Sequence, residues 1–130
     1  MGARKKSKPT LTTEARWFTQ SQFELGNQVY SENCARCHRQ YGQGIVEDWK
    51  QPNPDGSFPP PPLNGTAHTW HHPFEVLIKT INEGGEPIGG VMPAFGDSLR
   101  VEEKVTVIAY IQSLWSQEIY ERWVKMNAGQ

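Results

Sequence analysis

Long apolar runs are missing from this chain. The longest, over residues 105–111, is interrupted by Thr106, and it is far shorter than the roughly 20 apolar residues that a membrane-spanning helix needs. Only 36% of the 130 residues are hydrophobic, while 10 are proline and 12 are glycine, so side chains alone can form only a thin apolar core. The length fits one ordinary domain rather than two. The composition suggests that something besides side chains fills its centre.

Strand-like alternation and internal repeats are also missing, whereas apolar residues recur at helical spacing in several segments. This spacing predicts helices over about residues 19–35, over about residues 73–83 and from about residue 100 onwards. The segments 42–62 and 84–96 are rich in proline and glycine and are predicted to be loops. The chain is therefore expected to be all-α, with helices joined by long loops.

Polar residues and glycine mark the expected helix ends. Ser21, with Glu24 three positions later, predicts a capping box at the start of the first helix. Gly84 predicts the end of the second helix. Asp97 or Ser98 is expected to cap the last helix.

Charge is distributed unevenly along the chain. Residues 1–16 carry a net charge of +4 and the remaining residues carry −5. The basic start, MGARKKSKPT, contains no apolar segment and does not match an intact secretory signal. We expect residues 1–18 to be a flexible leader or an artificial remnant without a folded role. Residues 19–115 would form the folded domain, and residues 116–130, where the apolar stripe continues, would add a helical extension.

The two cysteines of the chain, Cys34 and Cys37, lie in the stretch NCARCHRQ. A redox-active cysteine pair normally lies between a buried strand and a helix within an alternating β/α pattern, and that pattern is missing here. A zinc site needs about four ligands, and the chain offers four at paired spacing: Cys34, Cys37, His68 and His72. The 30 residues between Cys37 and His68 are a much longer gap than in a compact zinc finger, so zinc is a weaker alternative.

The histidine directly after Cys37 favours a third interpretation. In the pattern Cys-x-x-Cys-His, both thiols bond to the vinyl groups of one porphyrin and the adjacent imidazole reaches the iron. Cysteines three positions apart lie about one helical turn apart, so both sulfurs meet the same ring edge. A covalent haem would also supply the apolar centre that the composition lacks. We predict that Cys34 and Cys37 form thioether links to haem c, and that His38 is an axial ligand of its iron.

Haem iron usually takes a second axial ligand, and the candidates here are Met92, Met126, His68, His71 and His72. Met92 lies in the stretch VMPAFG, 54 residues after His38. Pro93 fixes the backbone there and stiffens the loop that would present the sulfur. Methionine more often packs in a core, but Met92 lies far from any apolar stripe. Met126 lies at the polar C-terminal end, so Met92 is the predicted ligand.

These residues resemble those of class I c-type cytochromes, the small bacterial proteins that carry a single haem. The similarity covers about residues 23–114 and depends on four ordered pieces: GNQVYSENCARCH, PPPPLNGT, INEGG, and MPAFGDSL followed by VIAYIQSL. Cys-x-x-Cys-His with a later Met-Pro-x-Phe is much more specific than either pattern alone. The resemblance implies a cytochrome c fold, in which three to five helices and long Pro/Gly loops wrap around one covalently bound haem.

The resemblance also implies where the first and last helices cross. Gly26 and Tyr30 of the first helix correspond to the small and aromatic residues that meet the last helix, here at Val107 and Tyr110. Glycine is needed at such a crossing because the two backbones approach too closely for a Cβ atom.

Residues beside the haem are implied in the same way. The carbonyl of Pro61, or of Pro62 if the register of the four prolines is shifted, would accept the Nδ1 hydrogen of His38. Leu63 would press on the haem plane near His38, and Phe95 would also pack against the haem.

Three histidines and a tryptophan are concentrated in HTWHHP, residues 68–73. The simplest interpretation is a turn with exposed imidazoles, in which Trp70 packs beside the haem edge and its indole N–H donates to a propionate. A second metal site is an alternative for His68, His71 and His72, and copper is favoured by imidazole ligands. Ligation of the haem iron by one of these histidines is a further alternative.

The resemblance implies a one-electron carrier rather than an enzyme. With His38 and Met92 on the two faces of the iron, no position is open for oxygen or peroxide chemistry. The expected partners are redox proteins that dock transiently, without nucleic acid, and the chain is expected to be a monomer. Haem attachment of this type implies the periplasm or the outer face of the bacterial cytoplasmic membrane, with a tether through a preceding segment as one arrangement.

Two other classes of function stay open at this point. The chain could be the electron-transfer cytochrome subunit, or an excised domain, of a larger oxidoreductase. It could instead be a haem or metal sensor in which a small ligand displaces Met92. Binding of carbon monoxide to the reduced protein distinguishes the sensor from the electron carrier, and co-purification with an oxidoreductase supports the subunit.

Overall fold

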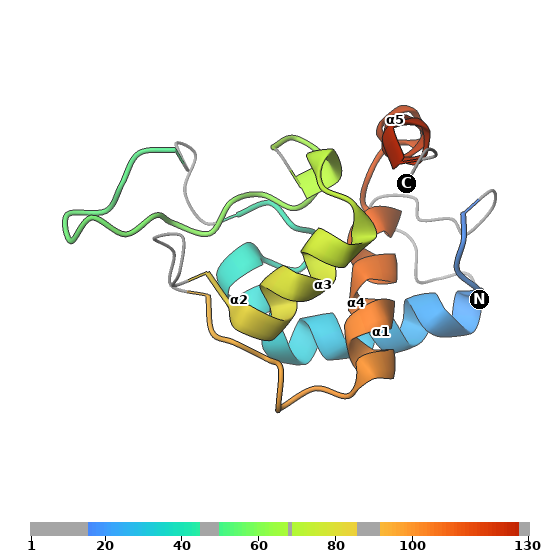
Figure 1. The fold of residues 1–130 in the computed structure, drawn as a ribbon, viewed down its shortest axis with the longest axis horizontal. Coiled ribbons are helices and arrows are strands. Elements are labelled where there is room, and N and C mark those ends of the chain that lie inside the picture. The colour runs from blue at the N-terminus through green and yellow to red at the C-terminus, as the bar shows by residue number, and fades with distance from the viewer. Residues whose placement is uncertain (1–15, 45–49, 68, 86–91, 128–130) are drawn as a thin grey trace.

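The computed structural model describes residues 16–44, 50–67, 69–85 and 92–127. In this part of the chain the elements are, in order, α1 (Gln20–Asn33), α2 (Ala35–His38), the 3₁₀ turn η2 (Thr69–His71), α3 (Phe74–Glu83), α4 (Val101–Ser113) and α5 (Gln117–Asn127) (Figure 1). None of the described residues belongs to a β-strand element. The expected all-α architecture is confirmed, and α1, α3 and α4 correspond to the predicted helices.

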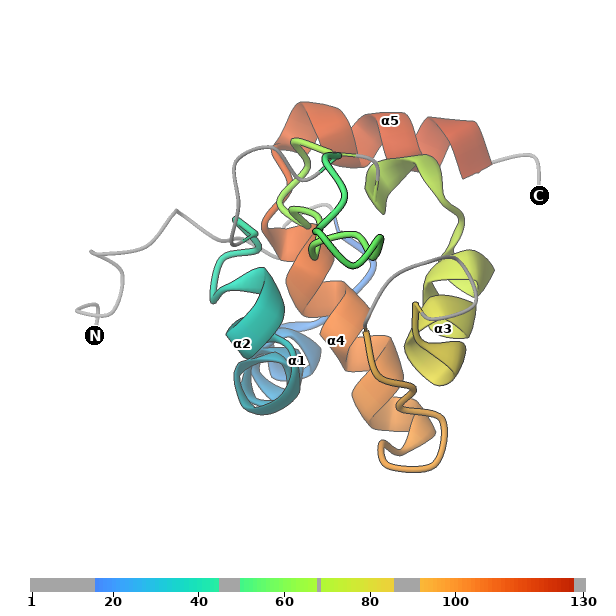
Figure 2. The same ribbon diagram turned by 90° about the vertical axis from the view of Figure 1, so that its left-hand side faces the viewer.

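Helix α4 lies at the centre of the helical arrangement. Figure 2 shows α1 and α2 on one side of α4 and α3 on the other, with α5 lying across one end. The contact of α1 with α4 is by far the most extensive between any two helices. The proline-rich segment around residues 50–60 is a loop, as its composition predicted, and it extends away from the helices (Figure 1).

Helices α1 and α4 cross at Gly26. A Cβ atom at this position would overlap the backbone carbonyl of Thr106 and would lie 3.2 Å from the Cβ atom of Tyr110. Only glycine therefore fits at the crossing. The predicted crossing is confirmed at Tyr110, but the closest backbone group belongs to Thr106, while the neighbouring Val107 is buried in the core.

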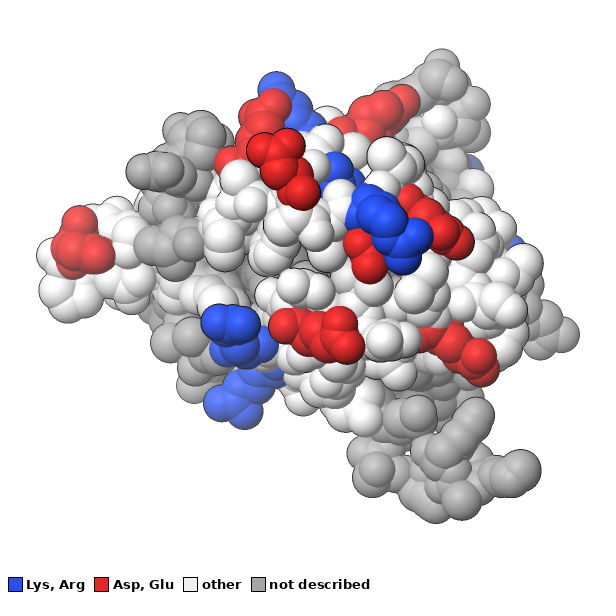
Figure 3. Space-filling model, turned by 90° about the horizontal axis from the view of Figure 1, so that it is seen from below, with Lys and Arg blue, Asp and Glu red and all other residues white. Residues whose placement is uncertain are grey.

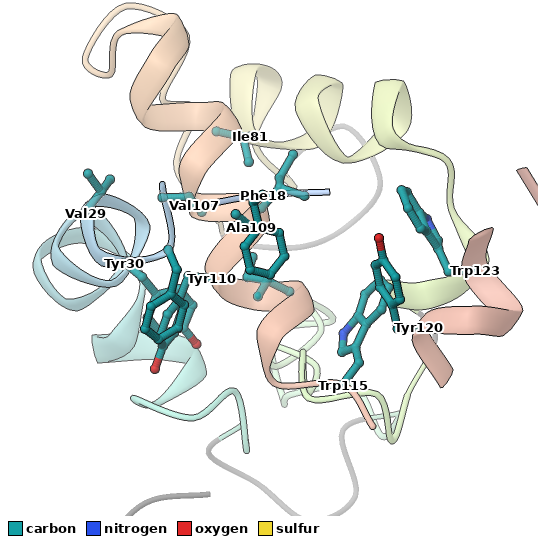
Figure 4. Close-up of a cluster of buried hydrophobic side chains, with 13 residues drawn as sticks. Phe18, Val29, Tyr30, Ile81, Val107, Ala109, Tyr110, Trp115, Tyr120 and Trp123 are labelled. Atoms are coloured by element: carbon teal, nitrogen blue, oxygen red, sulfur yellow. The ribbon is translucent and has the colours of Figure 1, made fainter. Parts of the chain in front are cut away.

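Two buried tyrosines connect this crossing to the turn that follows α2. The ring centroids of Tyr30 and Tyr110 are 4.8 Å apart, and Figure 4 shows the two rings side by side. The Tyr30 hydroxyl donates to the carbonyl of Arg39, and the Tyr110 hydroxyl donates to the carbonyl of Gln40, each over 2.6 Å. The core of α1 and α4 therefore fixes the backbone directly after His38.

The predicted cap of α1 is wrong. The cap is Thr19 rather than Ser21, because Thr19 has an extended backbone and its hydroxyl accepts the Gln22 N–H over 3.1 Å. The Gln22 side chain accepts the Thr19 N–H over 2.8 Å in return, which completes a capping box. The box thus lies two residues earlier than expected.

The predicted cap of α4 is also wrong. Neither Asp97 nor Ser98 caps it, because the N–H groups of Ser98 and Leu99 donate to the carbonyl of Phe95 and form a turn before the helix. Arg100 is the cap residue, and its N–H donates to the side chain of Glu103 over 2.8 Å.

Residues 16–18 belong to the folded part of the chain, which corrects the expected boundary of the leader. Phe18 is buried. The Arg16 guanidinium donates to the carbonyls of Gln112 and Trp115 over 2.6 and 3.0 Å and lies over the ring of Tyr120. These carbonyls lie in the last turn of α4 and just beyond it, and the Gln112 carbonyl also accepts the Trp115 N–H over 3.1 Å. The rest of the expected leader lies outside the described residues.

Helix α5 occupies the segment expected to be a helical extension, but it is a separate helix and does not continue α4. The side chains of Tyr120 and Trp123 are buried, and Figure 4 shows them grouped with Trp115. The Trp123 indole donates to the carbonyl of His72 over 2.8 Å. The apolar stripe of this segment therefore packs against the rest of the fold.

Candidate functional site

The cysteine pair lies where α1 meets α2. Cys34 is the cap residue that ends α1 and begins α2, while Cys37 and His38 lie on the single turn of α2. The N–H groups of Cys37 and His38 donate to the carbonyl of Cys34 over 3.1 and 2.9 Å. Both cysteines and His38 are thus held on one turn, as their spacing predicted.

Both cysteines are free thiols and are partly buried. Burial, with a smaller contribution from the neighbouring Cys37, raises the pKa of the Cys34 thiol to about 11. Such a thiol is protonated at neutral pH and is a poor nucleophile for disulfide exchange. The raised pKa of Cys34 therefore does not favour the redox-pair alternative.

His38 is only 8% exposed, and its Nδ1 atom lies 2.9 Å from the carbonyl oxygen of Pro61. A carbonyl only accepts, so Nδ1 carries the hydrogen. Burial lowers the pKa of His38, and the bond to Pro61 opposes this effect. The neutral ring then keeps a lone pair on Nε2, which has no hydrogen-bond partner among the described residues. This is the state in which an imidazole binds a metal.

The register of the proline run follows from its hydrogen bonds. Pro61, as the family resemblance implies, faces His38, whereas the carbonyl of Pro62 lies 3.5 Å from the Thr69 hydroxyl. The Leu63 N–H donates to the carbonyl of Gly42 over 2.7 Å, and the Leu63 carbonyl accepts the Trp115 indole N–H over 3.0 Å. Residues 61–63 are therefore tied both to the segment after His38 and to the end of α4.

The predicted haem neighbours share a common environment. They are partly exposed apolar side chains that pack against the same buried cluster: Cys34, Leu63, Trp70, Met92 and Phe95. The Trp70 ring lies beside the His71 ring, with centroids 4.0 Å apart, and its indole N–H has no acceptor within the part of the chain that the structure describes. Partly exposed apolar groups, two free thiols and a histidine with an available Nε2 form a donor set that fits a covalently held haem.

Met92 begins a segment that runs along the end of α3. The Met92 carbonyl accepts the Gly85 N–H over 3.0 Å, and the Phe95 N–H donates to the carbonyl of Ile81 over 2.8 Å. His38 belongs to α2 and the Met92 segment is bound to the end of α3, and these two helices lie on opposite sides of α4 (Figure 2).

The histidine cluster gains no support as a metal site. His68 lies outside the described residues, so neither the zinc alternative nor the second metal site can be assembled from the structure. His71 and His72 are exposed. Within the described ranges, no group of three or more His, Cys, Asp or Glu side chains could hold a metal ion.

Two features near the site were missed in the sequence. The hydrogen bonds from tyrosine hydroxyls to the turn after His38 could not be predicted, because aromatic residues at helical spacing indicate only a buried core. The role of Lys104 could have been suspected from the sequence, because this charged residue lies at helical spacing with the apolar residues Val101 and Ile108. Lys104 is a buried residue, and its ammonium group donates to the carbonyl of Gly96 over 2.9 Å.

Comparisons with known proteins agree with this geometry. The family model for "Cytochrome C oxidase, cbb3-type, subunit III" matches residues 21–111, well over half of the chain. Over 95 residues the chain is 33% identical to the cbb3-type cytochrome c oxidase subunit FixP of Sinorhizobium medicae, in an alignment that covers 68% of this chain and 29% of that relative. The chain thus spans less than a third of the length of this curated relative. No solved structure matches it significantly.

Proposed function

The chain belongs to the cytochrome family of cbb3-type cytochrome c oxidase subunit III, and we propose that it transfers single electrons as the cytochrome subunit or domain of a larger oxidoreductase. Covalently bound haem c with its iron is the cofactor of this family, and when bound it supplies a reversible one-electron change. The observation that carries the proposal is His38, with Nδ1 held by Pro61 and Nε2 available. The oxidase relative favours a subunit over the free-standing carrier that the sequence first suggested.

In this proposal each site residue has a distinct role. Cys34 and Cys37 hold the haem through thioether links, and His38 and Met92 bind the iron through Nε2 and the thioether sulfur. The fixed turn of α2 and the attachment of the Met92 segment to α3 support these roles. Iron held by both His38 and Met92 would have no position left for a substrate, and for this reason we propose electron transfer rather than catalysis or sensing.

The apolar neighbours would set the potential and limit access of water. Leu63, Trp70 and Phe95 are partly buried against the helical core. Apolar surroundings disfavour the extra positive charge of the oxidised site, so they raise the reduction potential. A hydrogen bond from the Trp70 indole to a propionate remains part of this proposal, because that N–H has no other acceptor in the described residues.

We place the protein on the periplasmic side of a bacterial membrane, next to the redox partner that it serves. The described helices include none that is long and apolar enough to cross a membrane. The face in Figure 3 carries basic and acidic side chains side by side. This face therefore carries no patch of one sign. Transient docking and a monomeric state remain proposals.

Electron transfer to an oxidase tests this function. The haem-loaded chain is reduced, freed of reductant and mixed with membranes that contain a cbb3-type oxidase, and its reoxidation is followed by absorbance. Rapid reoxidation with matching oxygen consumption, both abolished when cyanide inhibits the oxidase, is the expected result. Reoxidation that proceeds equally without an active oxidase would contradict the proposal.

The sensor alternative has its own test. Carbon monoxide is added to the reduced haem-loaded chain at neutral pH, and binding is followed by absorbance. Slow and incomplete binding is expected if Met92 occupies the iron. Rapid and complete binding would show an open or easily displaced position and would favour the sensor.

A further inference from the structure

We propose that Lys104 is a positioning residue for Met92. Its ammonium group holds the segment that follows Met92 against the start of α4, and so keeps the methionine sulfur on the iron. This inference rests on the proposed ligation by Met92. It assigns a role to a buried charge on α4 that the proposed electron transfer does not otherwise use.

The segment 92–96 is attached to α3 by its backbone. The Met92 carbonyl accepts the N–H of Gly85 over 3.0 Å. The Phe95 N–H donates to Ile81 over 2.8 Å, and the Gly96 N–H donates to Asn82 over 3.2 Å. Main-chain bonds at both ends fix the path of these five residues along the end of α3.

This attachment depends on a close approach at Gly84. Its φ angle is +77°, in the region that favours glycine. A Cβ atom there would lie 2.5 Å from the Met92 carbonyl oxygen and 2.9 Å from the Pro93 carbonyl carbon. The Met92 backbone therefore lies directly against the end of α3. If the segment 92–96 shifts relative to α3, Met92 shifts with it.

Lys104 fixes the other side of the same segment. Its Nζ atom donates to the Gly96 carbonyl over 2.9 Å, so Gly96 is bound to α3 through its N–H and to α4 through its carbonyl. Gly96 is the point at which the segment joins both helices. Releasing one of these bonds leaves the segment held from one side only.

The environment of Lys104 makes this bond matter. The residue is only 8% exposed, and no acidic side chain of the described residues forms an ion pair with it, whereas Arg100 and Arg122 pair with glutamates at the surface. A buried ammonium group is costly unless it is hydrogen-bonded, and a bond with a charged partner contributes more than a neutral one. The hydrogen bond to the Gly96 carbonyl offsets part of the cost of burying this charge.

Ligand replacement in the haem-loaded chain measures the consequence. Imidazole binds the oxidised iron only when the methionine has left, so its binding reports how often the segment opens. Lys104→Met keeps the length and apolar stem of the side chain but removes the bond. We expect imidazole to bind roughly tenfold to a hundredfold faster in this variant, from the contribution of a hydrogen bond with a charged group. Oxidised haem with a methionine ligand shows a weak near-infrared absorption band from charge transfer between the thioether and the iron. This band should weaken in parallel.

Two further variants separate positioning from charge and from general stability. Lys104→Arg keeps both charge and donor and should restore imidazole binding close to that of the unmodified chain. Lys79→Met removes the same charge from an exposed position on α3 and should leave both the band and imidazole binding unchanged. If Lys104→Met does not accumulate as a haem-loaded protein, Lys104→Gln, which has a neutral donor, replaces it. This variant should also bind imidazole faster than the unmodified chain, but by a smaller factor.

The outcomes distinguish this inference from the ligation on which it rests. If the unmodified chain shows the near-infrared band and the Lys104 variants bind imidazole no faster than Lys79→Met, the positioning role is wrong while Met92 remains the ligand. If the unmodified chain lacks the band, ligation by Met92 is wrong, and the role of Lys104 fails with it.

Discussion

The Nδ1–H group of His38 donates to the carbonyl of Pro61 over 2.9 Å. This bond joins two segments that are far apart in the chain, and it fixes both the tautomer and the orientation of the buried imidazole. It also makes the ring more basic, which stabilises the oxidised form of an iron bound to Nε2. The bond should therefore be measurable as a contribution to the reduction potential.

Replacing Pro61 tests that contribution. Pro61→Gly keeps the carbonyl but releases the backbone that aims it, so the hydrogen bond should weaken and the potential should rise. A loss of about 0.5 to 1.5 kcal/mol corresponds to roughly 20 to 60 mV for one electron. Pro54→Gly in the exposed loop is the matched control. Equal potentials in the two variants would count against the role of Pro61.

Met92→Ala tests the second ligand. Loss of the thioether should abolish the near-infrared band and lower the potential by on the order of 100 mV or more, because methionine ligation favours the reduced form. The reduced variant should also bind carbon monoxide rapidly. Met126→Ala, at an exposed position of α5, should change none of these properties. A Met92→Ala protein with its band intact would rule Met92 out.

Gly26→Ala tests the crossing of α1 and α4. The added methyl group would overlap the Thr106 carbonyl, so the free energy of unfolding should fall by about 3 kcal/mol. Gly56 has a positive φ, but no atom lies within 4 Å of the place that its Cβ would occupy, and Gly56→Ala should cost only about 1 kcal/mol. Denaturant unfolding of both variants gives the comparison. Equal losses would show that the crossing has room for a side chain.

Tyr30 predicts a dependence of stability on pH. Burial raises the pKa of its hydroxyl well above the ordinary value, so the folded state keeps the proton when the unfolded state releases it. The stabilisation is complete below about pH 10 and is lost as the pH rises further, by up to about 1.4 kcal/mol per pH unit.

The variant Tyr30→Phe isolates this effect. It lacks the hydrogen bond to Arg39 and should be about 1 kcal/mol less stable near neutral pH, but it also lacks the titrating group. The gap in unfolding free energy between the two proteins should therefore narrow above pH 10. A gap that stays constant to pH 11 would contradict the raised pKa.

Local patterns in the sequence were sufficient for much of the fold and the site. The apolar period located α1, α3 and α4, and the spacing of Cys34, Cys37 and His38 placed them on one turn. The partner of His38 was implied by family resemblance, and only the hydrogen bonds distinguished Pro61 from Pro62. Four consecutive prolines have no local feature that fixes their register.

The features that were missed depend on contacts between distant residues. Arg16 donates to carbonyls at and just beyond the end of α4, about a hundred positions later in the chain. No residue near Arg16 in the sequence predicts these contacts. The cap of α1 was predicted at Ser21 but is Thr19, because both residues have hydroxyl groups suited to a cap and only the extended backbone at Thr19 identifies the right one. The sequence shows Lys104 as a charged residue among apolar ones at helical spacing, but it does not predict that the Gly96 carbonyl is its hydrogen-bond acceptor.

The central claim is that Cys34 and Cys37 hold a haem c whose iron is bound by His38. The most direct test is the absorption spectrum of the chain produced in a bacterium that attaches haem in its periplasm, recorded before and after denaturation and acid extraction. The account predicts a thioether-linked haem spectrum that stays with the polypeptide and is lost in the Cys34→Ser, Cys37→Ser double variant. A colourless chain that binds zinc through its cysteines would contradict it.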